Sequence, residues 1–299
     1  MKALFKSPAV AGLLLISVFF LSLCPRTIFA AQDAANLPAG TPPVRMMMTD
    51  PGPIGVNTTT ALFSQVAIGA SGPGSYSTVF TLLNTGGTDL TGVLILTAGN
   101  GSPMNATFTS PPAAPATGDS YNIGPIHPGG TQFITASPVN ATAALVTGWG
   151  RVESSGGTIG GVGTFEFSQG GTLTTIAGVL AGNLVNVATV PVDNNQAANR
   201  FTGYAVANPS NANITVKIDV VNPDGTLKKT LTTPQLNPLG PHQQVARFLF
   251  QDDATLMTFQ GSMVLIAATG ESFSVVALVL DENLITAVPV IPSKAPGIN

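Results

Sequence analysis

Apolar and β-branched residues recur along this chain in short runs that alternate with polar residues and end at Gly, Pro, Asn or Ser. A period of two is typical of strands with one buried face, and the flanking residues are those that favour turns. The pattern predicts strands at 76–83, 92–97, 144–153, 162–167, 201–207, 214–221, 245–250, 261–267 and 273–280. Beyond Ala30 no segment has a sustained helical period, so we predict an all-β protein.

The strand and turn pattern occurs twice along the chain. Thr81-Leu82-Leu83-Asn84 and the apolar run from Leu90 return at a spacing of 124 as Ala205-Val206-Ala207-Asn208 and a run from Ile214. Pro125-Ile126-His127-Pro128 returns at a spacing of 113 as Pro238-Leu239-Gly240-Pro241. At a spacing of 111, Gly150, Thr158, Leu173, Thr175 and Val179 align with Gly261, Thr269, Leu284, Thr286 and Val290. Ordered matches whose spacing changes in loops indicate a duplicated unit.

Each copy contains about seven predicted strands, which favours an antiparallel sandwich of the immunoglobulin-like kind. We predict two tandem immunoglobulin-like antiparallel β-sandwiches after a signal peptide. The predicted divisions are a signal peptide at 1–30, a Pro- and Gly-rich linker at 31–56, β-sandwich 1 at 57–181, β-sandwich 2 at 182–292 and a tail at 293–299. An antibody-type domain would have a pair of cysteines flanking a Trp, and this chain lacks that cysteine pair. The topology within each sandwich therefore stays open.

The segment from Met1 to Ala30 has the features of a secretory signal. Lys2 and Lys6 precede an apolar stretch at 9–23, and Ala30-Ala31 supplies small residues for cleavage. That stretch is shorter than the roughly 20 residues of a spanning helix, so we expect no membrane span in the mature chain. The only cysteine, Cys24, lies in this leader, where lipidation is an alternative to cleavage after Ala30. The predicted location is secreted or cell-surface, meaning periplasmic or extracellular.

The chain carries little charge, since Asp, Glu, Lys and Arg make up 8% of its residues against about 25% in typical domains. Removing Lys2, Lys6 and Arg26 with the leader leaves 8 basic and 14 acidic side chains, a net charge of −6. Lys228-Lys229 is the only basic pair. Binding to nucleic acid needs clustered cations, so we expect no nucleic-acid partner.

Groups that could carry catalysis are few. His127 and His242 do not occupy equivalent positions in the two copies, and we interpret both as surface turn residues. Asp252-Asp253 and Asp281-Glu282 are neighbours that point to opposite faces of a strand, so neither pair is a ready acid/base couple. We interpret both pairs as solvated loop charge, with a calcium site as the alternative. The Gly-rich segment 156–163 lacks a Lys and a following helix, which indicates a hairpin connection rather than a phosphate loop. We predict no enzyme, no cofactor, and no catalytic or metal-binding residue.

Trp149 is the one candidate for a ligand-binding residue. It lies between Gly148 and Gly150, and such small neighbours either leave the ring open to a ligand or let it pack tightly. We favour tight packing in the core.

The duplicated strands resemble secreted bacterial proteins built of tandem immunoglobulin-like modules. The residues that carry the resemblance are Phe63 and 74–84 in the first copy, and 202–209, Phe259-Gln260-Gly261 and 273–278 in the second. The resemblance implies no catalytic residue. We predict a non-enzymatic secreted or surface protein with a structural or adhesive role, whose partner is an extracellular protein or glycan of unknown identity. The alternatives are a carbohydrate- or peptide-binding module and an exported subunit that self-associates by strand addition.

Overall fold

The strands predicted from the sequence are confirmed. The computed structural model describes residues 59–282 and 284–293. The predicted signal peptide with Cys24, the linker and the tail after Ser293 lie outside the described residues. All nine predicted strands are present, with ends that shift by at most three residues. The predicted strand 245–250 is wrong at its last two residues, because Leu249 and Phe250 begin a short helix instead.

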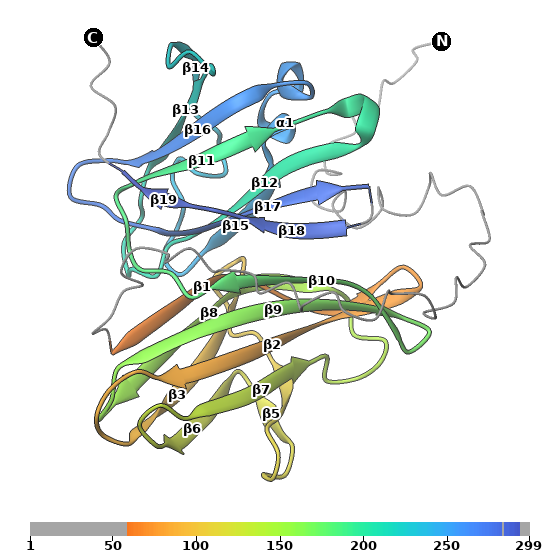
Figure 1. Ribbon diagram of the computed structural model, residues 1–299, viewed down its shortest axis with the longest axis vertical. Helices are drawn as coiled ribbons and strands as arrows, with labels where there is room; N and C mark the ends of the chain where they lie inside the picture. Colours follow the sequence, from red (N-terminus) through yellow and green to blue (C-terminus); the bar gives the residue numbers. More distant parts are fainter. Residues whose placement is uncertain (1–58, 283, 294–299) are drawn as a thin grey trace, which may run out of the picture. The chain divides into compact units, whose positions relative to one another are not determined.

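The chain forms two groups of strands (Figure 1). The first repeat, residues 60–180, contains β1 (Thr60–Ser71), β2 (Gly74–Asn84), β3 (Leu90–Ala98), β4 (Ala106–Thr109), β5 (Ala116–Gly118), β6 (Ser120–Ile126), β7 (Thr131–Ser137), β8 (Val146–Ser155), β9 (Ile159–Gln169) and β10 (Thr172–Leu180). The second repeat, residues 187–292, contains β11 (Val187–Asp193), β12 (Arg200–Ala207), β13 (Val216–Val221), β14 (Leu227–Leu231), β15 (Gln244–Phe248), β16 (Gln260–Ala267), β17 (Ser274–Asp281), β18 (Leu284–Val288) and β19 (Ile291–Pro292). Its short helices are the 3₁₀ turns η1 (Gln196–Ala198) and η2 (Ala254–Leu256) and the α-helix α1 (Leu249–Asp252).

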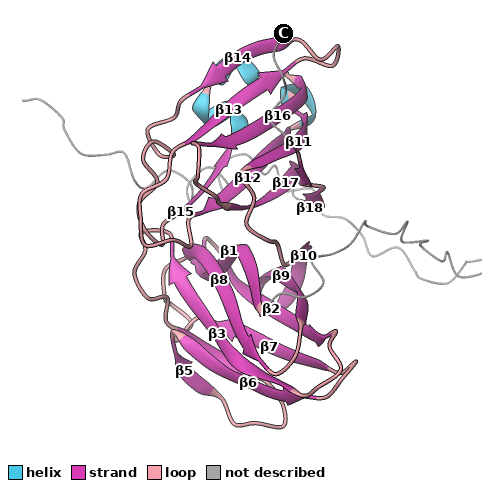
Figure 2. Ribbon diagram, turned by 90° about the vertical axis from the view of Figure 1, so that its left-hand side faces the viewer, coloured by secondary structure: helices cyan, strands magenta, loops and turns pink. Residues whose placement is uncertain are grey.

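In the first repeat two antiparallel layers enclose one core (Figure 2). One layer has the order β1-β8-β3-β6, and the other has the order β5-β4-β7-β2-β9-β10. β1 joins both layers, because Gly69, Ala70 and Ser71 turn to pair with the start of β2. Gly69 permits this change of layer: its φ is +124°, and a Cβ there would lie 2.3 Å from the carbonyl oxygen of Ala144. Phe63 and Phe80 meet edge to face in the core, with ring centroids 5.0 Å apart.

The second repeat has the same two-layer arrangement. One sheet has the order β14-β13-β16-β11-β19, and the other has the order β15-β12-β17-β18. Their inward side chains, which include Val206, Ile218, Leu265 and Phe273, form a separate buried core. The turn Asn222-Pro223-Asp224-Gly225 joins β13 to β14 as a hairpin, closed by a 2.9 Å hydrogen bond from Gly225 N to Asn222 O.

A buried asparagine holds the same loop in both repeats, which supports the duplication. Asn84 and Asn208 are both fully buried. The Nδ2 of Asn84 donates to Thr88 O at 2.7 Å and to Ile126 O at 2.8 Å, while its Oδ1 accepts from Gly86 N at 2.9 Å. Asn208 makes the equivalent bonds to Ala212 O at 2.7 Å, Leu239 O at 3.1 Å and Ser210 N at 3.0 Å. The spacings of 124 and 113 are therefore confirmed.

The spacing of 111 in the last part of the repeat is wrong as an alignment of strands. Thr78 pairs with Phe165, whereas its counterpart Thr202 pairs with Val279, so β9 and β17 correspond at a spacing of 114. The loop between β8 and β9 covers residues 156–158, and the equivalent loop before β17 covers 268–273. Strand and loop lengths both change in this part of the repeat. The five identical residues at a spacing of 111 therefore do not occupy equivalent structural positions.

The two repeats meet through a polar and apolar contact that we call the repeat joint: Leu62, Ser64, Trp149, Ala207, Gln244 and Ser274. The Oγ atoms of Ser64 and Ser274 lie 2.6 Å apart, and both residues are buried. Gln244 Nε2 donates to Ser64 O at 3.2 Å and to Gln65 Oε1 at 2.6 Å. Residues 181–186 connect the two repeats covalently.

Candidate functional site

Trp149 lies inside the repeat joint and not on an open face. Its side chain is 1% exposed and packs against Leu62 and Ala207. The indole Nε1 donates a 2.8 Å hydrogen bond to the carbonyl oxygen of His242 in the other repeat. A Cβ on Gly148 would lie 2.0 Å from Thr97 O, so the small neighbour serves close strand packing. Tight packing is confirmed, and Trp149 has no free ring face on which a ligand could stack.

The histidines lie on turns that belong to different repeats and contact different groups. His127 is exposed, and its Nδ1 lies 2.8 Å from Asp89 Oδ1. His242 has a φ of +58°, and its Nε2 lies 2.8 Å from Asn211 Oδ1. Its carbonyl oxygen, rather than its ring, contacts Trp149. The structure therefore does not bring the two imidazoles into one site.

The interpretation of Asp252-Asp253 as solvated loop charge is wrong. The Asp252 side chain is fully buried, accepts from Arg247 Nε at 2.6 Å and accepts from the Tyr204 hydroxyl at 2.6 Å. Burial raises the pKa of Asp252 and, together with the Asp252 charge, raises the pKa of Tyr204 well above its usual value. This cluster fastens α1 to β12 and β15, and the Asp252 side chain, which is 0% exposed, is not open to a substrate. The spacing of Arg247 and Asp252 across a short turn was the sequence signal for this ion pair.

Asp253 has a different structural role. Its Oδ1 accepts from Thr255 N at 2.9 Å at the start of η2, and its Oδ2 forms an ion pair with Lys229 on β14. The second acidic pair is also structural in part, since Asp281 Oδ2 accepts from Arg200 Nη2 at 2.6 Å. Asp193 accepts from Arg200 Nη1 at 3.1 Å, so one guanidinium joins three strands.

We predict that Asp253→Asn will weaken the loss of stability in acid. Lys229 and Thr255 lower the pKa of Asp253 from 3.8 to about 2. A carboxylate with a depressed folded-state pKa stabilises the fold above its unfolded pKa, and that contribution is lost as the pH falls towards 2. Between pH 4 and 2 the urea midpoint should therefore fall less for the variant than for the unaltered chain. Lys229→Gln should act in the same direction, and equal acid sensitivity in all three chains would contradict the prediction.

The Gly-rich segment joins two strands, but the predicted hairpin is wrong. β8 pairs with β1 and β3, whereas β9 pairs with β2 and β10, so residues 156–158 cross from one layer to the other. Two of the glycines lie within β9 beside the core: a Cβ on Gly161 or Gly163 would lie 3.2 or 3.1 Å from the Phe63 ring. These glycines make room for an aromatic side chain, and the segment has no phosphate-binding geometry.

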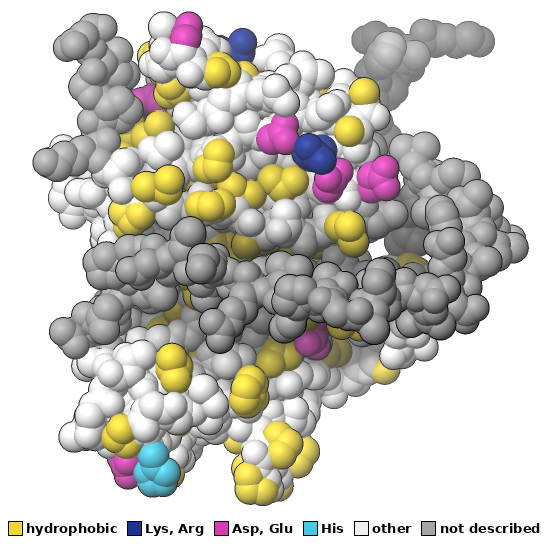
Figure 3. Space-filling view, in the orientation of Figure 1, with side chains coloured by type: hydrophobic (Ala, Val, Ile, Leu, Met, Phe, Trp, Pro, Cys, Tyr) yellow, Lys and Arg dark blue, Asp and Glu magenta, His cyan; other side chains and the backbone are white. Residues whose placement is uncertain are grey.

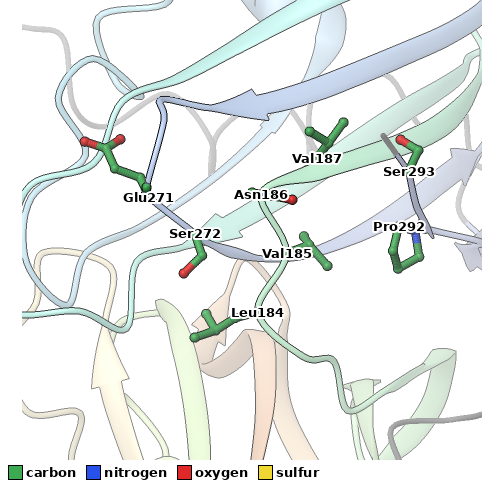
Figure 4. Close-up of a pocket in the computed structure, with 9 residues that line it drawn as sticks. Leu184, Val185, Asn186, Val187, Glu271, Ser272, Pro292 and Ser293 are labelled. Carbon is green, nitrogen blue, oxygen red and sulfur yellow. The ribbon is translucent and has the colours of Figure 1, made fainter. Parts of the chain in front are cut away.

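An open depression of about 600 Å³ lies at the start of β11, lined by residues 184–187, 270–272 and 292–293 (Figure 4). Its one charged side chain is Glu271, whose Oε2 already accepts from Thr215 N at 2.6 Å. In Figure 4 this side chain points away from Pro292 and Ser293. Glu271 thus fixes the backbone at Thr215 through one of its carboxylate oxygens.

Within residues 59–282 and 284–293 no three His, Cys, Asp or Glu side chains gather as a metal site would require. The same residues include no helix long and apolar enough to span a bilayer. Comparison with protein-family models, with curated proteins and with solved structures finds no match to this chain.

Proposed function

We propose that this chain is a non-enzymatic secreted or surface protein with a structural or adhesive role, and that its repeats are two immunoglobulin-like sandwiches exported by a signal peptide. The observation that carries the proposal is that buried carboxylates of this chain are hydrogen-bonded to neighbouring side chains and not open to a substrate. Asp252 is closed off by Arg247 and Tyr204, and the buried Asp219 accepts from Lys217 Nζ at 2.9 Å and Thr230 Oγ1 at 2.6 Å. A reactive carboxylate needs an open face towards substrate.

The surface composition supports the same proposal. Charged side chains are sparse on the face shown in Figure 3, in keeping with the 8% charged content of the chain. A rigid β scaffold with loops of variable sequence is a common platform for recognition outside the cell.

Attachment can be measured with residues 31–299 coupled to beads. We expect saturable attachment to an extracellular protein or glycan surface, without turnover of the bound material. Heat-denatured protein on the same beads is the control for non-specific adhesion. His127→Ala should attach as the unaltered chain does, since that ring is exposed and its Nδ1 pairs with Asp89 Oδ1. Turnover of a glycan or peptide by the folded protein, and not by the heat-denatured control, would overturn the proposal.

A further inference from the structure

β10 is the last strand of its sheet and contains nothing that discourages pairing with a further strand (Figure 1). In the described part of the chain it pairs with β9 alone, and it contains no charged residue and no proline. Its register with β9 is continuous from Thr175 to Leu180. Charged side chains, proline and bulges are the usual protections of an edge strand. The stretch from Thr175 to Leu180 is therefore a regular strand with one unprotected side.

The hydrogen bonds just after β10 show which backbone groups point to its open side. Ala181 N donates to Gly161 O at 2.8 Å, so the backbone groups of Ala181 point towards β9. Gly182 exchanges hydrogen bonds of 2.7 and 3.3 Å with Leu62, so its backbone groups point the other way. Successive residues of a strand alternate in this direction, and every second residue before Gly182 therefore also points away from β9.

The backbone groups of Ile176, Gly178 and Leu180 form this open side. Within residues 59–282 and 284–293, no backbone hydrogen bond engages them. They are accessible, since Ile176 is 50% and Leu180 48% exposed, and Gly178, which has no side chain, is also exposed. Each of the three residues offers one N–H and one C=O, so β10 presents a short ladder of donors and acceptors.

The inner face of β10 is packed, which holds this ladder extended. Ala177 and Val179 are buried together with Phe165 of β9 and Val276 of the second repeat. A strand that is ordered before a partner arrives loses little conformational entropy on binding.

The outer face of β10 indicates which side chains a partner strand should carry. A residue that pairs with Gly178 points its side chain to the same face, between Ile176 and Leu180. A large aromatic side chain on a neighbouring strand compensates for the side chain that a glycine lacks. Glu166 pairs with Ile176 on β9, so an acidic side chain beside Ile176 is unfavourable.

We propose that the edge of β10 binds an extended, neutral or basic segment of a partner protein, which adds as an antiparallel strand and places an aromatic side chain across Gly178. In strand addition the main-chain hydrogen bonds provide affinity and alternate side chains provide specificity. The paired segment is short, because the open side ends where Gly182 pairs with Leu62. The inference rests on the proposed adhesive role, for which it names a partner class and a site.

The probe is the labelled, capped peptide Lys-Thr-Val-Thr-Phe-Thr-Val-Thr-Lys, titrated with residues 31–299 and followed by fluorescence anisotropy. We expect saturable binding. N-methylation of the Phe amide, which would face β10, should weaken binding about tenfold, the effect of losing one hydrogen bond. N-methylation of the next Thr amide, which would face away, should leave binding unchanged. Equal effects of the two methyl groups, or no saturable binding, would overturn the proposal.

Gly178→Pro tests the same pairing from the side of the protein. The Gly178 N–H points away from β9, so proline breaks no hydrogen bond of the sheet and is tolerated at such an edge position. We expect about tenfold weaker peptide binding and an unchanged urea midpoint. Phe133→Ala, at an exposed side chain of β7 in the same sheet, is the matched control and should bind as the unaltered chain does. The methylated peptides test the proposal even where this variant fails to fold.

Two further readouts separate the occupant of the edge from the adhesive role. Dimers that form without peptide and are abolished by Gly178→Pro, measured by light scattering, would make a second copy the occupant and overturn the proposal. Peptide binding that depends on the Phe amide, in a chain that does not attach to beads, would contradict the adhesive role and support strand addition at β10.

Discussion

Trp149→Ala should lower the free energy of unfolding by about 3–5 kcal/mol, the usual cost of truncating a large buried aromatic side chain. The ring is 1% exposed between Leu62 and Ala207, and its Nε1 makes the 2.8 Å hydrogen bond to His242 O. The substitution leaves a cavity at the contact between two cores. We therefore also expect the unfolding transition to broaden or separate into two, because the repeats lose the apolar part of the repeat joint and keep only its Ser64–Ser274 and Gln244 hydrogen bonds as polar contacts there. Urea denaturation followed by circular dichroism measures both effects.

Two variants separate the packing of Trp149 from its hydrogen bond. Trp149→Phe keeps most of the apolar contact but removes the donor to His242 O, and should cost about 1–2 kcal/mol. Phe133→Ala, at a side chain of β7 that is 58% exposed, should change stability by less than about 0.5 kcal/mol. A Trp149→Ala chain as stable as the Phe133→Ala chain would show that Trp149 does not stabilise the repeat joint.

The strands were predictable because their signal is local. In β3, Leu94, Leu96 and Ala98 are buried at every second position, which is the alternation visible in the sequence. The hairpin turn at Asn222 was predictable for the same reason, since Pro and Gly set its backbone. The helical conformation of Leu249 was not predictable, because a buried leucine after an apolar run fits both a strand and the first residue of a short helix.

The sequence reduced the role of Trp149 to two alternatives, a ring open to a ligand or a ring packed in the interior. Gly148 and Gly150 fit both an open ring and tight packing, and the contact that decides between them comes from Leu62 and Ala207. Those residues are distant in sequence, and no periodicity marks them as partners. The same limit applies to Asp252, because its burial depends on Tyr204, which lies on another strand. Long-range contacts, rather than local pattern, decide which polar residues are structural.

Asn208→Ala should cost about 2–6 kcal/mol, because it removes four hydrogen bonds of a fully buried side chain at a net contribution of about 0.5–1.5 kcal/mol each. The Asn208 side chain donates to Ala212 O at 2.7 Å, Gly240 O at 2.9 Å and Leu239 O at 3.1 Å. Its Oδ1 also accepts from Ser210 N at 3.0 Å. Asn208 itself is fully buried, although Ser210 and Ala212 are exposed residues of the loop that it holds. The free energy of unfolding from urea titration is the measurement.

The duplication provides the matched comparison for this prediction. Asn84→Ala removes bonds to Thr88 O, Ile126 O and Gly86 N at the equivalent place in the first repeat, so its cost should be similar. Asn208→Asp preserves the shape but replaces the donating amide by a carboxylate facing three carbonyl oxygens, and should be at least as damaging as Asn208→Ala. Asn211→Ala, an exposed neighbour whose Oδ1 contacts only His242 Nε2, should be nearly neutral. If Asn208→Ala were as mild as Asn211→Ala, the buried asparagine would be an inherited residue of the duplicated unit and not the fastening of its loop.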